Sequence, residues 1–316
     1  MKINKKLFIN MLMLCLSFSA FSKTKIIASI FPEYDWTKEI IGENKDRFDL
    51  QLLMKDGVDL HSFQPSVKDI AAIGNADIFI YVGGESDNWV SAVLQNAKNK
   101  ELKAINLMEI LSDKLHEEEV IEGMEAESEC ENEDEEEIEY DEHVWLSLKN
   151  TKILCMAITN EICIKDPGYE SYYRNNLKAY SEKLDSLDKE FERTVASSKR
   201  KTLLFGDRFP FRYLTEDYGL KYYAAFTGCS AESEASFKTV AFLSKKLDKE
   251  KLPYVLQIEN SNGKLTSTII KNSKSKNIQV LTLNSMQTTS SYDIKDGANY
   301  LNYMKDNLES IKKALN

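Results

Sequence analysis

Apolar and polar residues are distributed along this chain in two recurring patterns, one typical of strands and the other of helices. The apolar runs that have the length of buried strands span 26–30, 50–54, 77–82 and 103–107. Stretches with helical spacing of apolar residues lie between them, at 35–41, 67–76 and 89–98. Strands that are almost continuously apolar and that alternate with helices predict a parallel α/β sheet covered on both faces.

A second α/β series begins after residue 200. Strands are predicted at 202–205, 222–226, 255–258 and 279–283, and helices at 209–218, 235–246, 264–271 and 297–315. A single long helix is predicted at 169–199, between the two series. Its apolar stripe, at spacings of three and four, consists of Leu177, Tyr180, Leu184, Leu187 and Phe191. At 1.5 Å per residue this helix reaches about 45 Å, enough to run along two lobes.

The predicted architecture is therefore α/β, with two parallel-sheet lobes joined by a long rigid helix. The expected parts are a signal peptide at 1–22, a first lobe at 23–167, a linking helix at 168–200 and a second lobe at 201–316. A single large Rossmann sheet is the alternative. No GxGxxG motif follows the first strand, which removes the main support for that alternative.

The first 22 residues have the pattern of a secretory signal peptide. Three lysines among the first six residues precede an apolar run from Leu7 to Phe21, and Ala20 and Ser22 are the small residues of a cleavage site. About 15 apolar residues are fewer than the roughly 20 that span a bilayer, which favours cleavage over a membrane anchor. Leu14 precedes Cys15 where a lipidation site needs a small residue. We therefore expect an exported protein in the periplasm or at the cell surface.

Charge is concentrated in one segment. The chain carries 51 acidic and 41 basic residues, and 16 of the acidic ones lie between Glu117 and Glu142, where there is no Lys or Arg. The rest of the chain has 35 acidic residues against the same 41 basic ones. We expect 117–142 to form a disordered loop that self-repulsion holds open, and with His116 it can hold additional ions weakly. The acidic balance argues against a nucleic-acid partner.

Four cysteines remain after the signal peptide, at positions 130, 155, 163 and 229. Export permits disulfides. No pair has CxxC spacing, so the sequence does not predict a thiolate zinc site. Cys155 and Cys163 lie in an apolar helical stretch and are expected to be small buried side chains.

The chain has only three histidines, at positions 61, 116 and 143. His61 lies in the loop after the strand predicted at 50–54, and His143 follows the acidic segment at the start of the next helix. Ligands of parallel α/β sheets gather in loops of this kind. A lone histidine is more often a hydrogen-bonded polar residue, but two in matching loops beside carboxylates favour a metal site.

Several segments resemble the zinc- and manganese-binding solute-binding proteins of bacterial ABC importers, the ZnuA-like or cluster A-I family. They are His61–Ser66 (HSFQPS), Ala76–Gly84 (ADIFIYVGG), His143–Leu146 (HVWL), Tyr213–Leu220 and Gly297–Leu315. The resemblance implies a metal cleft between two α/β lobes, with His61 and His143 as ligands of one transported Zn²⁺ or Mn²⁺. It also implies a monomer that delivers its ion to the membrane permease of an ABC importer.

The second lobe departs from the pattern of that family. Relatives place a third His or a Glu a few residues before the Tyr-Gly-Leu stretch, and here that position holds Arg208, which cannot bind a cation. Its neighbour Asp207 is the predicted third ligand. Glu232 is the predicted fourth, with Glu234 as an alternative that also suits a helix N-terminus. The expected site of imidazoles and carboxylates fits Zn²⁺ or Mn²⁺ and does not separate them.

Two further classes of function compete with transport. An exported metal-dependent hydrolase needs an open metal position and a general base, and the chain has neither HExxH nor GxSxG. A surface adhesin is the third class, and the chain shows no repeats and no wall-anchoring tail. The sequence therefore predicts a metal-binding transport component that is not an enzyme.

Overall fold

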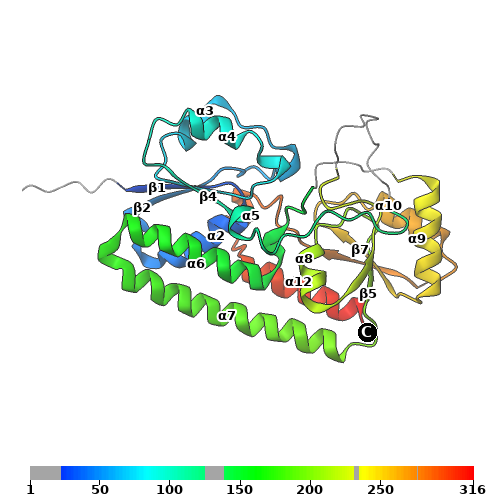
Figure 1. Cartoon of the computed structure of the whole chain (residues 1–316). Helices are drawn as coiled ribbons and strands as arrows, with labels where there is room; N and C mark the ends of the chain where they lie inside the picture. The colour runs from blue at the N-terminus through cyan, green and yellow to red at the C-terminus, as the bar shows by residue number, and fades with distance from the viewer. Residues whose placement is uncertain (1–22, 125–138, 231–234, 276) are drawn as a thin grey trace, which may run out of the picture.

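The computed structural model describes residues 23–124, 139–230, 235–275 and 277–316. Two α/β lobes lie side by side along one long helix, α7 (Figure 1). Every helix in these described ranges is too short or too polar to cross a membrane.

The first lobe contains a parallel sheet of four strands in the order β2-β1-β3-β4. The strands are β1 (Thr24–Ala28), β2 (Phe48–Leu52), β3 (Ile78–Tyr81) and β4 (Lys103–Asn106). Helices α3 and α4 cover one face of the sheet, and α2 and α6 cover the other (Figure 1). These helices are α2 (Phe31–Ile41), α3 (Val67–Ile73), α4 (Val90–Gln95) and α6 (Leu148–Lys165). Helices on both faces explain why the strands are apolar on both sides.

The second lobe repeats this winding. Its strands are β5 (Thr202–Leu204), β6 (Lys221–Tyr223), β7 (Tyr254–Ile258) and β8 (Gln279–Leu283), and its helices include α8 (Arg212–Tyr218), α9 (Phe237–Lys249) and α10 (Lys264–Asn272). The pairs β5–β6 and β7–β8 are parallel, and a parallel bridge between Phe205 and Leu256 joins them. The order β6-β5-β7-β8 is therefore the counterpart of β2-β1-β3-β4. The predicted parallel α/β architecture is confirmed.

Helix α7 (Glu170–Ser197) has 28 residues, about 42 Å at 1.5 Å per residue. It packs against α2 and α6 and also reaches α8. Four members of the predicted stripe, Tyr180, Leu184, Leu187 and Phe191, are buried along it, and the fifth, Leu177, is partly buried. The helix therefore spans both lobes through one apolar face.

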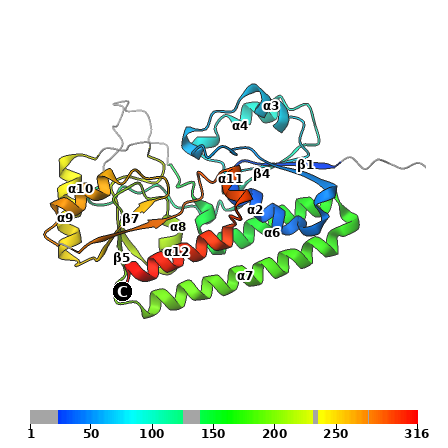
Figure 2. The ribbon, with the colours of Figure 1, turned by 180° about the vertical axis from the view of Figure 1, so that it is seen from behind.

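The C-terminal segment returns from the second lobe to the first. Helices α11 (Ser291–Lys295) and α12 (Tyr300–Ala314) run back along the molecule (Figure 2). The backbone N–H of Ser291 donates to the carbonyl of Lys55 at 2.8 Å, and the backbone N–H of Tyr300 donates to Asp35 Oδ2 at 2.9 Å. One hydrophobic cluster includes residues of both lobes. The lobes therefore share a core, and the segment predicted as the second lobe also contacts the first.

The remaining elements are short. They are α5 (Leu107–Ile110) and five 3₁₀ segments at Gly42–Arg47, Leu60–Ser62, Glu85–Asp87, Val144–Leu146 and Pro167–Tyr169. Three of these segments supply or flank the functional site described below.

Both ends of the acidic segment are ordered. Glu117 and Tyr140 form an antiparallel bridge. Glu119 and Glu122 form ion pairs with basic side chains of α8 and α9, at 2.8 and 3.0 Å. Disorder was expected across 117–142, whereas the described ends of this segment form a bridge with each other and ion pairs with basic side chains of the second lobe. Residues 125–138 lie outside the described residues.

Candidate metal centre

His61 lies on the 3₁₀ turn Leu60–Ser62 in the connection that follows β2. Asp59 precedes this turn, and its Oδ1 accepts a hydrogen bond from the backbone N–H of His61 at 3.1 Å. Leu60 is fully buried beneath the turn. The cap and the buried leucine fix the backbone, so the imidazole points toward the space between the lobes.

His143 immediately precedes the 3₁₀ turn Val144–Leu146, whose three residues are all fully buried. The backbone N–H of His143 donates to Asp141 Oδ1 at 2.8 Å. The imidazole itself is fully buried. The motif that was recognised in the sequence as HVWL therefore anchors this histidine through apolar side chains.

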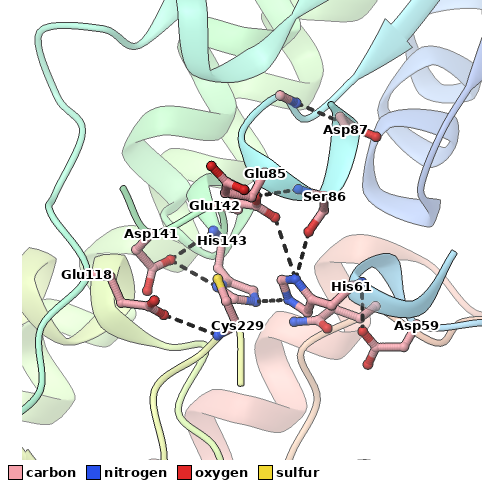
Figure 3. Close-up of polar contacts among 12 residues, drawn as sticks. Asp59, His61, Glu85, Ser86, Asp87, Glu118, Asp141, Glu142, His143 and Cys229 are labelled. Atoms are coloured by element: carbon pink, nitrogen blue, oxygen red, sulfur yellow. Dashed lines mark hydrogen bonds and ion pairs between the residues drawn. The ribbon is translucent and has the colours of Figure 1, made fainter. Parts of the chain in front are cut away.

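The two imidazoles face one another (Figure 3). Their Nε2 atoms lie 3.2 Å apart. Zn–N bonds of 2.0–2.1 Å in a tetrahedral site place two ligand nitrogens about 3.3 Å apart. The observed separation thus matches one edge of a zinc coordination tetrahedron.

The neighbours of each ring determine which nitrogen can bind a metal. His143 Nδ1 lies 2.9 Å from Asp141 Oδ1, and an ionised carboxylate only accepts, so Nδ1 carries the proton and Nε2 presents its lone pair. His61 Nδ1 lies 2.8 Å from Ser86 Oγ, which can accept from it in the same way. Both Nε2 atoms can then bind one cation, and the partners at Nδ1 hold the rings in that orientation.

Burial keeps His61 uncharged. It lowers the pKa of His61 to about 3, and the nearby His143 adds to the shift. Glu142 lies beside His61, with Oε2 at 3.6 Å from Nδ1 and without a hydrogen-bond partner among the described residues. Burial raises the pKa of Glu142. His61 is therefore neutral, the form that metals bind.

The second lobe contributes Cys229 to the same place. One donor atom each from His61, His143 and Cys229 lies within 4.8 Å of the others, the only such group of three or more His, Cys, Asp or Glu residues in the described ranges. Cys229 sits in the connection that follows β6, and its backbone N–H donates to Glu118 Oε1 at 3.2 Å. Burial and nearby carboxylates raise the pKa of its thiol.

The expected ligand set was one of imidazoles and carboxylates without thiolates, and the structure places a thiol beside the two imidazoles. That expectation relied on the lack of CxxC spacing, which identifies cysteines close in sequence. The signal that would have found Cys229 is topological, because it follows β6 as His61 follows β2. Cys155 and Cys163 are buried in α6 as predicted, and Cys130 lies outside the described residues.

Asp207, the predicted third ligand, lies in the connection after β5, outside the His61–His143–Cys229 group. Its Oδ1 accepts from the backbone N–H of Arg208 at 3.0 Å. It lines an adjacent polar cavity of about 320 Å³ that Asp59 and Arg208 also line. Its role as a ligand remains a prediction.

Arg208 forms an ion pair with Asp59 across the two lobes. Burial alone would raise the pKa of Asp59, but the guanidinium lowers it below its usual value. Arg208 Nη2 also donates to Gln287 Oε1 at 3.3 Å. The cation at the position of the family's third histidine is thus neutralised by a first-lobe carboxylate.

The other acidic candidates differ in what can be said of them. Glu232 and Glu234 lie outside the described residues, so both remain predictions. Glu259 accepts hydrogen bonds from the backbone N–H and the hydroxyl of Ser285, at 2.7 and 2.6 Å.

The chain was also compared with known proteins. The sequence profile of the family "ZnuA: Zinc-uptake complex component A periplasmic" matches residues 26–314. The zinc-binding lipoprotein AdcA of Streptococcus pneumoniae strain R6 is 31% identical over 293 residues, which cover 92% of this chain and 56% of AdcA. The high-affinity zinc uptake system protein ZnuA of Bacillus subtilis is 29% identical over 295 residues, covering 93% of this chain and 88% of that protein.

A solved structure agrees with these sequence matches. The Zn(II)-bound ZnuA-like domain of S. pneumoniae AdcA superimposes with a TM-score of 0.71 and 28% identity, covering 93% of this chain and 99% of that domain. The chain spans just over half of the length of the AdcA relatives that it matches.

Proposed function

The chain belongs to the ZnuA family of periplasmic zinc-uptake components, and we propose that it binds one divalent cation between its lobes and delivers it to the permease of an ABC importer. Zinc is the proposed cargo, with manganese as the alternative. The observation that carries the proposal is the pair of Nε2 atoms 3.2 Å apart, each on a ring whose Nδ1 has a polar partner. The role is binding and release, without catalysis.

The geometry supports capture by two lobes that move little. Helix α7 and the shared core connect the lobes rigidly, so small adjustments of the connecting loops suffice to enclose or expose an ion. A carrier of this kind must bind its ion tightly and still release it to the permease. A set of few protein ligands, contributed by both lobes, meets that need.

The family description and the lipoprotein relative support a place outside the cytoplasm. We propose that residues 1–22 are removed as a signal peptide and that the mature chain acts as a monomer in the periplasm or at the cell surface. The hydrolase alternative has less support, since the family match is to an uptake component.

Calorimetry on the purified full chain, stripped of metal by a chelator, tests this function. We expect one Zn²⁺ per chain and a loss of affinity of at least about 100-fold in both His61→Ala and His143→Ala, because removing even an outer-shell partner costs 10–100-fold. His116→Ala is the matched control, because His116 is not in the ligand group of the described residues and its ring contacts Tyr213 instead. Undiminished binding in both ligand variants would overturn the proposal.

Delivery needs a separate test. In the bacterium that encodes this chain, replacement of the gene by the His143→Ala form should prevent growth under zinc limitation, and added zinc should restore it. The His116→Ala strain should grow normally. Normal zinc-limited growth of the His143→Ala strain would contradict the delivery role.

A further inference from the structure

We propose that Cys229 is the second-lobe ligand, so that two imidazoles and one thiolate hold the transported ion. This inference rests on the proposed function and assigns the part of the site that the family resemblance leaves open. It also identifies the class of cargo, a borderline or soft cation such as Zn²⁺ in preference to Mn²⁺.

The geometry already comes close to a complete zinc site. In a tetrahedron with Zn–N of 2.0–2.1 Å and Zn–S of 2.3 Å, nitrogen and sulfur ligands lie about 3.6 Å apart. The Sγ of Cys229 lies within 4.8 Å of one ring nitrogen of each histidine. A movement of the loop by about 1 Å therefore completes three positions of the tetrahedron, and a fourth remains for water or a further carboxylate.

The local sequence explains how the loop comes so near. Gly228 packs directly against His143, and an added Cβ would lie 2.9 Å from Cε1 of that ring and 2.9 Å from the carbonyl oxygen of Phe209. Only glycine allows this approach of backbone to ring. The hydrogen bond from the Cys229 backbone N–H to Glu118 fixes the other side of the loop.

The connection after β5, where the family pattern places a histidine, contributes no side chain to the His61–His143–Cys229 group. Arg208 is a cation, and its guanidinium is paired with Asp59. One oxygen of Asp207 is bound to the backbone N–H of Arg208, and the side chain lies outside the ligand group. The proposed second-lobe ligand thus lies in the connection after β6, whereas the family pattern places it in the connection after β5.

The thiol determines which ions the site prefers. Thiolate and imidazole suit Zn²⁺ and softer cations, whereas Mn²⁺ prefers carboxylate, carbonyl and water oxygen. Binding replaces the S–H bond by a metal–sulfur bond, and the proton leaves to solvent. A site of two His and one Cys should therefore bind zinc far more tightly than manganese.

Cobalt spectroscopy tests the metal–sulfur bond directly. Co²⁺ bound to the reduced full chain should show a thiolate-to-metal charge-transfer band in the near ultraviolet. Cys229→Ser should abolish the band and lower zinc affinity by at least about 10-fold, the lower end of the loss from an outer-shell change. Cys163→Ser is the matched thiol control. It should keep the charge-transfer band and the zinc affinity, because Cys163 lies in α6 and outside the ligand group.

Three further variants separate the possible ligands. Cys229→His should restore zinc binding without the band, which shows that the serine variant had not simply failed to fold. Cys229→Asp should narrow the ratio of zinc to manganese affinity, because an oxygen ligand replaces the thiolate. Asp207→Ala should leave the band and the zinc affinity unchanged.

The outcomes distinguish this inference from the proposed function. If the wild-type chain binds no zinc, the proposed function fails. If it binds zinc but shows no charge-transfer band, and Cys229→Ser binds zinc equally well, the thiolate ligand is wrong while the proposed function stands. Loss of zinc binding in Asp207→Ala with an unchanged Cys229→Ser variant would assign the third ligand to Asp207 instead.

Discussion

The two lobes have the same strand order but present their candidate ligands in different ways. In the first, β2-β1-β3-β4 leads to His61 after β2 and to His143 after β4, and both rings have a polar partner at Nδ1. In the second, β6-β5-β7-β8 leads to Cys229 after β6, held through its backbone and the close approach of Gly228. The first lobe offers a fixed imidazole pair, and the second adds one candidate ligand from a loop.

The connections after the first strand of each lobe differ as well. After β1, the carboxyl group of Glu33 is fully buried. It accepts hydrogen bonds from the backbone N–H groups of Ser29 and Ile30 and from the Ser29 hydroxyl. After β5, Arg208 is paired with Asp59 of the opposite lobe. Corresponding loops have thus acquired a buried acid in one lobe and an ion pair in the other. The lobes share a scaffold, whereas the chemistry of each loop is its own.

The largest effect that we expect comes from Glu33. Burial raises its pKa from 4.5 to about 8, and the nearby Asp87 adds to the shift. A raised folded-state pKa means that the stabilisation is complete below pH 4.5 and is lost as pH rises toward 8. Between pH 4.5 and pH 7 the free energy of unfolding should fall by about 3 kcal/mol on account of this group, at 1.36 kcal/mol per pH unit.

Glu33→Gln should remove this dependence, because an amide oxygen can still accept from Ser29 and Ile30. Urea unfolding at several pH values measures it. The variant should resemble the wild type near pH 4.5 and be more stable at pH 7. Glu39→Gln, on the same helix but partly exposed, is the control and should follow the wild-type curve. Parallel curves for Glu33→Gln and the wild type would contradict the raised pKa of Glu33 in the folded chain.

The second effect concerns the orientation of the first-lobe pair. In the wild type, the Asp141 carboxylate accepts from His143 Nδ1 and so fixes the tautomer of that ring. Asp141→Asn replaces this acceptor by an amide, which can also donate. We expect zinc affinity to fall about 10–100-fold, as for other partners of metal-bound histidines. Calorimetry measures the loss. Ser86→Ala removes the hydroxyl partner of His61. Its loss of zinc affinity should be smaller than that of Asp141→Asn, because a hydrogen bond to a neutral group is weaker than one to a carboxylate. Equal zinc affinity in Asp141→Asn and the wild type would mean that the buried core alone orients the ring.

Much of the fold follows from hydrophobic patterning. The strand at 279–283 coincides with β8, and the long amphipathic helix lies within two residues of its predicted bounds at each end. These elements have strong local signals, since they are nearly continuous apolar runs or regular stripes. The return of α12 to the first lobe could not be predicted, because its contact with Asp35 joins residues 265 positions apart.

The site was predictable only where a motif is local. His61 and His143 lie in short segments that resemble a known family, and the structure brings them together. Cys229 has no neighbouring cysteine or histidine in sequence, so its proximity depends on both sheets and on the loop that glycine permits. Likewise the pairing of Arg208 with Asp59 depends on how the lobes face one another. Such contacts between lobes leave no periodic signal in the chain.

The smallest effect concerns the loop of the second lobe. Gly228→Ala places a methyl group 2.9 Å from His143 Cε1 and from the Phe209 carbonyl oxygen, so ring or loop must shift. Overpacking of this kind typically costs 1–3 kcal/mol, and we expect the displaced thiol to lower zinc affinity about 10-fold. Gly168→Ala, at the start of α7 with open space around it, is the matched control. If the cobalt charge-transfer band weakens in Gly228→Ala while the unfolding free energy of the metal-free chain changes little, the methyl group has acted on the ligand loop. A reduced unfolding free energy with full zinc affinity would instead show that Gly228 serves only the contact between the lobes, and that the second-lobe ligand is positioned without it.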